Sequence, residues 1–300
     1  MDSPTNTLMT LLRERVHALC AEGNLDEALH AATAAVEKSQ QTLSQDFGTI
    51  DAFASALEVR ADLLRQMGML GEARDDYKQA IDQLDNRPDR FDQLGRLCAG
   101  LGAANDAAGK TERAVELWEQ AMQYFEKADP PLLLDVAAMA NNIAFLKKAE
   151  GNMDVAESHF LKALEILHTV LGPDHEETAA VSNNLGALYH AAGYHEQARE
   201  MHMMALEARR KTLGDNHPDT AQSHNNLALA MLETGDRAWA RRHFEKALLA
   251  FEQLGPECAA DLDATASNYC EFLRSEGEEQ LAALIEGRVQ AVLGTFEVSA

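Results

Sequence analysis

The sequence has 300 residues, of which 26 are lysine or arginine and 49 are aspartate or glutamate, for a net charge of −23. Nucleic-acid phosphates and acidic membrane surfaces repel a chain this acidic, which excludes a nucleic-acid partner bound through phosphate contacts. Hydrophobic residues make up 46% of the sequence, a value typical of a folded protein rather than a disordered one.

The chain begins with residues 1–7, which we expect to form a short tail. This segment has no basic stretch followed by an apolar one, so the sequence predicts no signal peptide. No run of about 18 apolar residues predicts a transmembrane helix. The four cysteines lie far apart, as in a protein whose thiols stay reduced, and we therefore expect a cytoplasmic protein.

An internal repeat occupies residues 8–293. Each copy has a glycine followed five residues later by an alanine, as in GNMDVA at Gly151 and GYHEQA at Gly193. Successive glycines are 45, 41, 42, 42, 42 and 42 residues apart, at Gly23, Gly68, Gly109, Gly151, Gly193, Gly235 and Gly277. Apolar residues recur at helical spacing on both sides of each glycine, so every copy predicts a helix, a tight turn and a second helix.

The second helix of each copy carries a small–large–small stripe. In the fifth copy this stripe is Ala198, His202 and Ala205, which lie on one face of a helix. The large position is held by Tyr77, Trp118, Phe160, His202 and Phe244 in successive copies. We expect these residues to pack in the core between the paired helices.

The first helix of the third copy contains three glycines, Gly95, Gly100 and Gly102. Each interior glycine costs a helix about 1 kcal/mol relative to alanine. Two interpretations are open: the helix is a loose hinge, or the glycines let another chain segment approach its backbone closely.

The later copies resemble a known family. The segments LGPDHEETAAVSNNLGALY from Leu171 and LGDNHPDTAQSHNNLALAM from Leu213 share an LG-x-x-H-x-x-T-A signature followed by an asparagine pair. With the 42-residue period, this pattern resembles the kinesin light chain type of tetratricopeptide repeat. The resemblance implies an all-α, right-handed superhelical solenoid of about seven helix pairs. The chain as a whole is most similar to the bacterial kinesin light chain-like proteins that accompany bacterial tubulins.

Copies four to seven carry asparagines on the side of the first helix opposite its core-facing residues. We expect a partner-binding groove formed by Asn141, Asn142, Phe145, Asn183, Asn184, Ala187, Asn225, Asn226, Leu229 and Asn268. An amide both donates and accepts, so these residues can hydrogen-bond the backbone of an extended peptide. The resemblance implies this role, since groove asparagines hold cargo peptides in the family. The alternative is that one asparagine of each pair bridges to the neighbouring repeat.

The sequence predicts neither catalytic residues, nor a metal site, nor a cofactor. It has no nucleophile elbow, no phosphate-binding loop and no pair of histidines spaced for zinc on one helix face. We therefore expect a non-catalytic scaffold that binds a partner segment in its concave groove. The resemblance implies a partner such as a tubulin-like cytoskeletal filament or a filament-associated protein.

Two further expectations concern binding. The family's preference for tryptophan-acidic peptides needs a basic groove, and the candidate bases here are few: Lys148, Arg274 and Arg65. We therefore do not expect that specificity. The alternative function is a membrane-associated linker that uses the apolar end segment AVLGTFEVSA, of which residues 294–300 are expected to form a tail.

Overall fold

The computed structural model of the chain describes residues 4–85 and 87–299. This part is 85% helical and contains no strand, so the predicted all-α fold is confirmed. The helices fall into two compact units, Met1–Leu146 and Lys147–Ala300, called here the N-terminal and the C-terminal unit.

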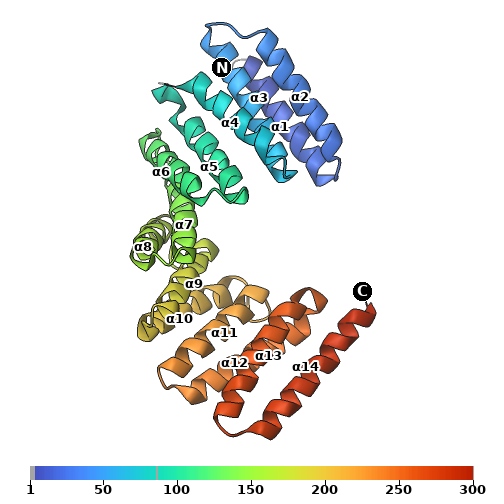
Figure 1. Ribbon diagram of the computed structural model, residues 1–300, viewed down its shortest axis with the longest axis vertical. Coiled ribbons are helices and arrows are strands. Elements are labelled where there is room, and N and C mark those ends of the chain that lie inside the picture. Colours follow the sequence, from blue (N-terminus) through green and yellow to red (C-terminus); the bar gives the residue numbers. More distant parts are fainter. Residues whose placement is uncertain (1–3, 86, 300) are drawn as a thin grey trace. The chain divides into compact units, whose positions relative to one another are not determined.

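Helix pairs follow one another along the whole described chain (Figure 1). The N-terminal unit contains α1 (Pro4–Ala21), α2 (Leu25–Gln41), α3 (Phe47–Gln66), α4 (Leu70–Leu84), the short η1 (Pro88–Arg90), α5 (Phe91–Ala107), α6 (Thr111–Lys127) and most of α7 (Leu133–Ala149). The C-terminal unit contains α8 (Met153–Val170), α9 (Glu176–Ala191), α10 (His195–Thr212), α11 (Pro218–Glu233), α12 (Arg237–Leu254), η2 (Pro256–Cys258), α13 (Ala259–Ser275) and α14 (Glu279–Ser299).

The two helices of each pair are joined at the glycine that the sequence identified. All seven of these glycines have a positive φ, between 71° and 86°. At Gly193, for example, the amide of the next residue, Tyr194, donates to the carbonyl of Tyr189 and closes the end of α9. A side chain is strained in this left-handed conformation, which explains why glycine recurs at the turn.

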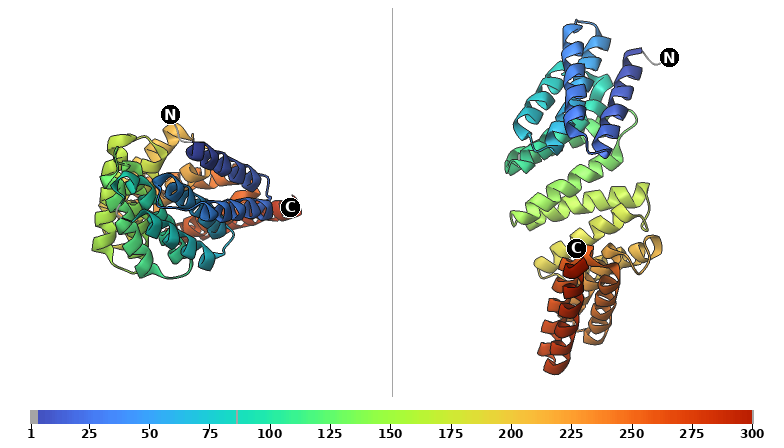
Figure 2. Two further views of the ribbon diagram at one scale, coloured as in Figure 1. Left: turned by 90° about the horizontal axis from the view of Figure 1, so that it is seen from above. Right: turned by 90° about the vertical axis from the view of Figure 1, so that its right-hand side faces the viewer.

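Within each unit the helices are arranged in two layers. In the C-terminal unit α9 contacts α11, and α11 contacts α13; in the N-terminal unit α1 contacts α3, and α3 contacts α5. We call these first helices the inner layer of each unit. Second helices pack on their own partner and on the next inner helix, as α10 does on α9 and α11 and as α4 does on α3 and α5. Figure 2 shows the same stacked pairs in two further views.

The core lies between the two layers and is built from the predicted stripe. Ala198, Ala205 and Ala240 are fully buried, and His202 is 3% exposed. The aromatic residue Phe244 occupies the corresponding position of the next repeat and is 0% exposed. Small residues on both sides of a large one therefore let the paired helices approach closely, as the sequence predicted.

The glycines of α5 are explained by close approach and not by a hinge. A Cβ atom at Gly100 would lie 2.6 Å from the ring of Tyr77, and one at Gly102 would lie 2.5 Å from Nε1 of Trp118. These rings belong to α4 and α6, which flank α5 on either side in the chain. The indole N–H of Trp118 also donates to the carbonyl of Ala99 at 3.2 Å. Glycine thus makes room for two large buried rings.

The terminal helices extend farther than the sequence indicated. We expected tails at 1–7 and 294–300, yet α1 begins at Pro4 and α14 runs to Ser299. Proline is favoured in the first turn of a helix because its missing N–H has no partner there. At the other end no proline interrupts the helical pattern after Glu279. Residues 1–3 and 300 lie outside the described residues.

Candidate functional site

The predicted groove residues of the C-terminal unit all lie on the inner helices. Asn183, Asn184 and Ala187 belong to α9, and all three are half-buried. Asn226 and Leu229 on α11 are also half-buried, as is Asn268 on α13. The one predicted position of this unit that differs, Asn225, is described next.

Asn225 is buried, with 5% of its surface exposed, and its side chain joins two repeats. The amide nitrogen Nδ2 of Asn268 donates to Oδ1 of Asn225 over 3.2 Å. The same bond recurs one repeat earlier, where Nδ2 of Asn226 donates to Oδ1 of Asn183 over 2.9 Å. In both cases the second asparagine of one repeat donates to the first asparagine of the preceding repeat. We call this pair of bonds the amide ladder.

The amide ladder is the bridging alternative that the sequence left open. Each bond spans 43 positions, one more than the repeat period, because donor and acceptor occupy adjacent positions of the motif. The side chain of Asn226 also accepts a hydrogen bond from Nε2 of Gln222 at 3.0 Å. An amide nitrogen carries two protons, so Asn226 and Asn268 each retain donor capacity beyond the ladder bond.

The acceptor Asn183 has a second donor, His202. The Nδ1 atom of His202 lies 3.1 Å from Oδ1 of Asn183, which can only accept, so Nδ1 carries the proton. Burial, with smaller contributions from His190 and Lys148, lowers the pKa of His202 to about 4. The imidazole is therefore neutral near pH 7. A Cβ atom at Gly186 would lie 2.8 Å from this ring, which explains a glycine inside α9.

The remaining predicted site residues lie on α7. Asn141 and Asn142 are half-buried, and the ring of Phe145 is 60% exposed. These three residues belong to the N-terminal unit. Phe145 is thus an exposed aromatic residue on the first helix of the fourth repeat.

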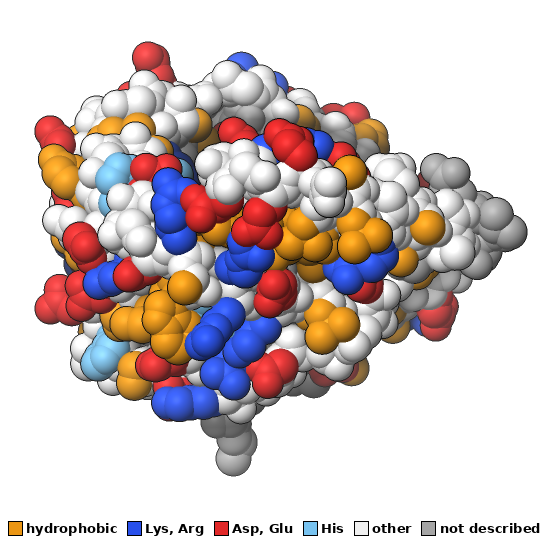
Figure 3. All heavy atoms as spheres, turned by 90° about the horizontal axis from the view of Figure 1, so that it is seen from below, with side chains coloured by type: hydrophobic (Ala, Val, Ile, Leu, Met, Phe, Trp, Pro, Cys, Tyr) orange, Lys and Arg blue, Asp and Glu red, His pale blue; other side chains and the backbone are white. Residues whose placement is uncertain are grey.

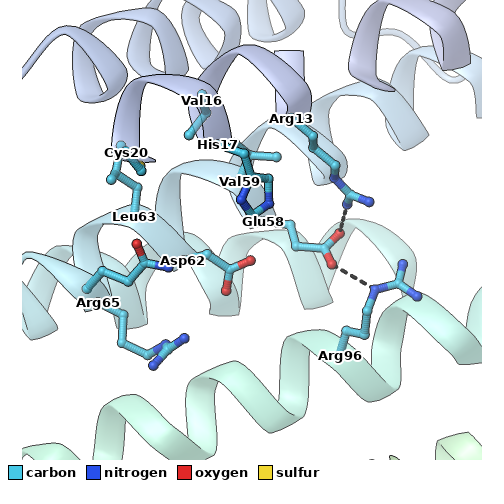
Figure 4. A pocket seen from close by; sticks show the side chains of 11 residues that line it. Arg13, Val16, His17, Cys20, Glu58, Val59, Asp62, Leu63, Arg65 and Arg96 are labelled. Atoms are coloured by element: carbon cyan, nitrogen blue, oxygen red, sulfur yellow. Dashed lines mark hydrogen bonds and ion pairs between the residues drawn. The ribbon is translucent and has the colours of Figure 1, made fainter. Parts of the chain in front are cut away.

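The inner layer of the N-terminal unit contains a cavity of about 310 Å³ between α1, α3 and α5 (Figure 4). Glu58 lies in its wall and is 4% exposed. Its two carboxylate oxygens accept from Arg13 at 2.6 Å and from Arg96 at 3.0 Å, as the dashed lines in Figure 4 mark. Gln93 donates to the same carboxylate at 2.9 Å. The carboxylate thus cross-links three inner helices.

A second carboxyl group, Asp62, lines the same cavity. The hydroxyl of Tyr77 donates to Asp62, and burial is the main cause that raises the pKa of this aspartate. Neither Glu58 nor Asp62 was predicted from the sequence. The available signal was helical register, since Glu58 follows the buried Ala54 by four residues and Asp62 follows the buried Val59 by three.

Two histidines of the C-terminal unit, the buried His224 and the half-buried His243, lie against each other. The Nδ1 atoms of His224 and His243 lie 2.7 Å apart, and burial lowers the pKa of both. In the described part of the chain, no group of three or more His, Cys, Asp or Glu side chains is arranged to hold a metal ion. None of the helices over residues 4–85 and 87–299 is both long and apolar enough to cross a membrane.

The comparisons with known proteins agree with this repeat geometry. Residues 135–211 and 180–253 match the tetratricopeptide repeat family. No curated protein matches the chain by sequence. The crystal structure of BtubC (BKLC) from P. vanneervenii is 26% identical with a TM-score of 0.64, over 75% of this chain and 90% of that one.

Two further solved structures show the same fold. The TPR-like repeats of Podosopora anserina, described as those of a kinesin light chain, are 23% identical with a TM-score of 0.55, over 66% of this chain and 94% of that one. The C-terminal part of a TPR repeat-containing protein from Cytophaga hutchinsonii is 13% identical with a TM-score of 0.65, over 93% of this chain and 95% of that one. Residues 135–253 therefore match tetratricopeptide repeats, and the described chain is an all-α superhelical solenoid whose fold is similar to those of BtubC, a bacterial kinesin light chain-like protein, and of other tetratricopeptide repeat structures.

Proposed function

We propose that the chain is a non-catalytic scaffold whose inner layer binds an extended segment of a partner protein. Tetratricopeptide repeats build protein–protein interaction scaffolds, which is the function the fold supports. The observation that carries the finer proposal is the recurrence of a half-buried amide at Asn184, Asn226 and Asn268, one per inner helix of the C-terminal unit. Alanine and leucine side chains lie beside these amides, at Ala187 and Leu229.

We propose two different roles for the predicted asparagines. Asn183 and Asn225 accept the ladder bonds, and we assign them to bracing the repeats. Asn226 and Asn268 donate those bonds and keep further amide capacity toward a ligand backbone. In the N-terminal unit, we include the exposed Phe145 among the contact residues.

A tubulin-like filament or a filament-associated protein is the partner class we propose. The support for this class is the similarity to BtubC, at 26% identity over most of both chains. We also place the chain in the cytoplasm, because its four cysteines are free and three of them are buried, as in proteins that keep reduced thiols.

The alternative of a membrane-associated linker is less well supported. It relied on the apolar segment that follows residue 290. In the structure this segment continues α14, and Val292 and Leu293 pack against the hydrophobic core of the C-terminal unit. Side chains used in this way are not available to enter a bilayer.

Co-sedimentation with polymerised bacterial tubulin tests the proposal. The substitution Ala264→Trp places a bulky ring on the exposed inner face of α13, and Ala238→Trp places the same ring on the exposed surface of α12. We expect the wild-type chain and Ala238→Trp to pellet with filaments and Ala264→Trp to stay in solution. Equal pelleting of both variants would show that the inner layer is not the binding surface.

A further inference from the structure

Charge is divided unevenly between the two layers of the C-terminal unit. The inner helices α9 and α11 contain no lysine or arginine, and α13 contains only Arg274. The guanidinium of Arg274 is paired with Glu286 at 2.6 Å. The second helices α10 and α12, by contrast, each contain four lysine or arginine residues. Figure 3 shows one face of the surface, where basic side chains gather between acidic and hydrophobic ones.

Three acidic side chains lie on the same face of the inner helices as the ladder donors. Glu233 follows Asn226 by seven residues, and Asp261 precedes Asn268 by seven, so each lies two helical turns from its asparagine on one face. Glu271 follows Asn268 by three residues and is its neighbour on that face. All three carboxylates are exposed.

These carboxylates are not neutralised within the chain. Among the described residues, no lysine or arginine lies within ion-pair distance of Asp261 or Glu271. Glu233 has only His195 nearby, with Nε2 4.0 Å away. The inner face therefore carries exposed carboxylates beside its amides that are not paired with a lysine or arginine of the described chain, and basic side chains of a partner would complement them.

Spacing indicates how an extended segment would match this surface. Neighbouring packed helices are about 8–10 Å apart, and an extended chain advances about 3.3 Å per residue. One repeat therefore corresponds to about three residues of ligand. Lysine or arginine at about every third position would place one cation near each inner helix.

We infer that the groove of the C-terminal unit binds a basic, extended peptide segment, with Asn226 and Asn268 facing its backbone and Glu233, Asp261 and Glu271 facing its lysine or arginine side chains. This inference rests on the proposed function, because it names the chemistry of the segment that the same groove holds. It predicts a specificity opposite to that for acidic peptides, since added negative charge is repelled by the three carboxylates.

Fluorescence anisotropy with three labelled 12-residue peptides tests the inference on the intact chain. The peptides share an alanine–serine background and carry lysine, glutamine or glutamate at every third position. We expect the lysine peptide to bind most tightly and the glutamate peptide most weakly. The double change Glu233→Gln, Glu271→Gln should weaken binding of the lysine peptide about two- to thirtyfold, since exposed charge pairs contribute about 0.2–1 kcal/mol each.

A control separates groove recognition from the attraction of any acidic protein for a basic peptide. Glu200→Gln, Glu207→Gln removes two exposed charges from α10 in the second layer. This variant should bind the lysine peptide as the wild type does. Equal weakening in both double variants would overturn the inference, because the attraction would then depend on net charge alone.

Two other outcomes separate this inference from the proposed function. If the glutamine or glutamate peptide binds more tightly than the lysine peptide, and Ala264→Trp abolishes that binding, the inferred specificity for basic segments is wrong. The proposed function, binding of a segment at the inner layer, is then still supported. If none of the three peptides binds, or if Ala264→Trp leaves all binding unchanged, both the inference and the proposed groove fail.

Discussion

The inner layers of the two units are held together by different chemistry. In the N-terminal unit, the buried carboxylate of Glu58 accepts from Arg13, Arg96 and Gln93 and so joins three inner helices. In the C-terminal unit, neutral amides join successive inner helices through the Asn226–Asn183 and Asn268–Asn225 bonds. The inner helices of this repeat can therefore be connected either by ion pairs or by neutral amide hydrogen bonds.

The difference has a consequence for binding. Four arginines of the N-terminal inner layer are paired with carboxylates, as Arg60 is with Asp76 at 2.6 Å; they are Arg13, Arg15, Arg60 and Arg96. The buried Nε of a fifth, Arg65, has no hydrogen-bond partner. The inner helices of the C-terminal unit are connected by amides instead. We propose that the exposed carboxylates of this layer face a basic partner segment, whereas the paired charges of the N-terminal layer interact within the fold.

The largest expected difference between the units is in acid stability. Burial lowers the pKa of His202 to about 4, whereas the ordinary value is 6.5. Between these two pH values the unfolded chain binds more protons than the folded chain, so stability falls as pH decreases from 6.5 to 4. The full shift corresponds to about 3 kcal/mol from this one residue.

The substitution His202→Phe isolates that contribution, because phenylalanine already occupies the equivalent position at Phe160 and Phe244. Urea unfolding at pH 7.5 and pH 4.5 should show a smaller acid-induced loss for the variant than for the wild type. Hydrogen exchange should locate the wild-type loss in the C-terminal unit. Parallel pH profiles for the two proteins would contradict a neutral buried His202.

The glycines of α5 give the next largest effect, this time in the N-terminal unit. Gly102→Ala would place a Cβ atom 2.5 Å from Nε1 of the buried Trp118. Overpacking of this kind costs about 1–3 kcal/mol. The matched control is Gly71→Ala in α4, where a Cβ atom meets nothing within 4 Å. We expect a lower unfolding midpoint for the first variant and an equal or higher midpoint for the control. If the two variants are equally stable, the interpretation of α5 as a loose hinge is favoured instead.

Loss of the ion pairs that Glu58 makes with Arg13 and Arg96 should lower stability by a smaller but measurable amount. Glu58→Gln keeps the shape of the side chain but removes the charge that Arg13 and Arg96 share. These arginine side chains are 39% and 40% exposed, so solvent replaces part of the lost interaction, and we expect a loss of about 1–2 kcal/mol. Glu14→Gln, an exposed change on α1, serves as the control. If chemical denaturation gives the same stability for both variants, Glu58 does not stabilise the packing of α1, α3 and α5.

The repeat architecture could be predicted from sequence because it depends on local rules. A glycine with positive φ at each turn and alanines at each helix contact are visible residue by residue, and Gly193 and Ala198 are as predicted. The side-chain hydrogen bonds between repeats were harder to predict. Asn226 and Asn183 are 43 residues apart, and only the packing angle between α9 and α11 decides whether they meet.

The exposure of the candidate groove residues was predicted only in part, for the same reason. Helical periodicity placed Asn225 on the same side as Asn226, yet the neighbouring inner helix buries Asn225. A periodic pattern gives the direction of a side chain relative to its own helix and not the position of the next helix. The ion pairs of Glu58 were not predicted for a related reason. Charged residues are uncommon at core-facing positions of a helix, and the partners Arg13 and Arg96 lie on two other helices.

The smallest expected effect concerns the amide ladder, and it separates the two roles assigned to the asparagines. Asn225→Ala removes an acceptor that is 5% exposed and leaves the N–H of Asn268 without its partner. One lost hydrogen bond lowers stability by about 0.5–1.5 kcal/mol, and the better helix propensity of alanine offsets part of this. A bound partner should be held as before, because Asn225 braces the repeats from inside the layer.

Asn226→Ala is the matching test of the donor. It removes the bond to Asn183, the bond accepted from Gln222 on the same helix and the remaining amide capacity toward a ligand, so both the unfolding midpoint and the affinity for a bound segment should fall. The comparison between the two variants is decisive, since each loses one ladder bond. If Asn225→Ala and Asn226→Ala lower stability equally but only Asn226→Ala weakens binding, the donors contact the partner. If affinity is unchanged in both, the asparagines only brace the repeats, and the partner contacts the groove through other residues.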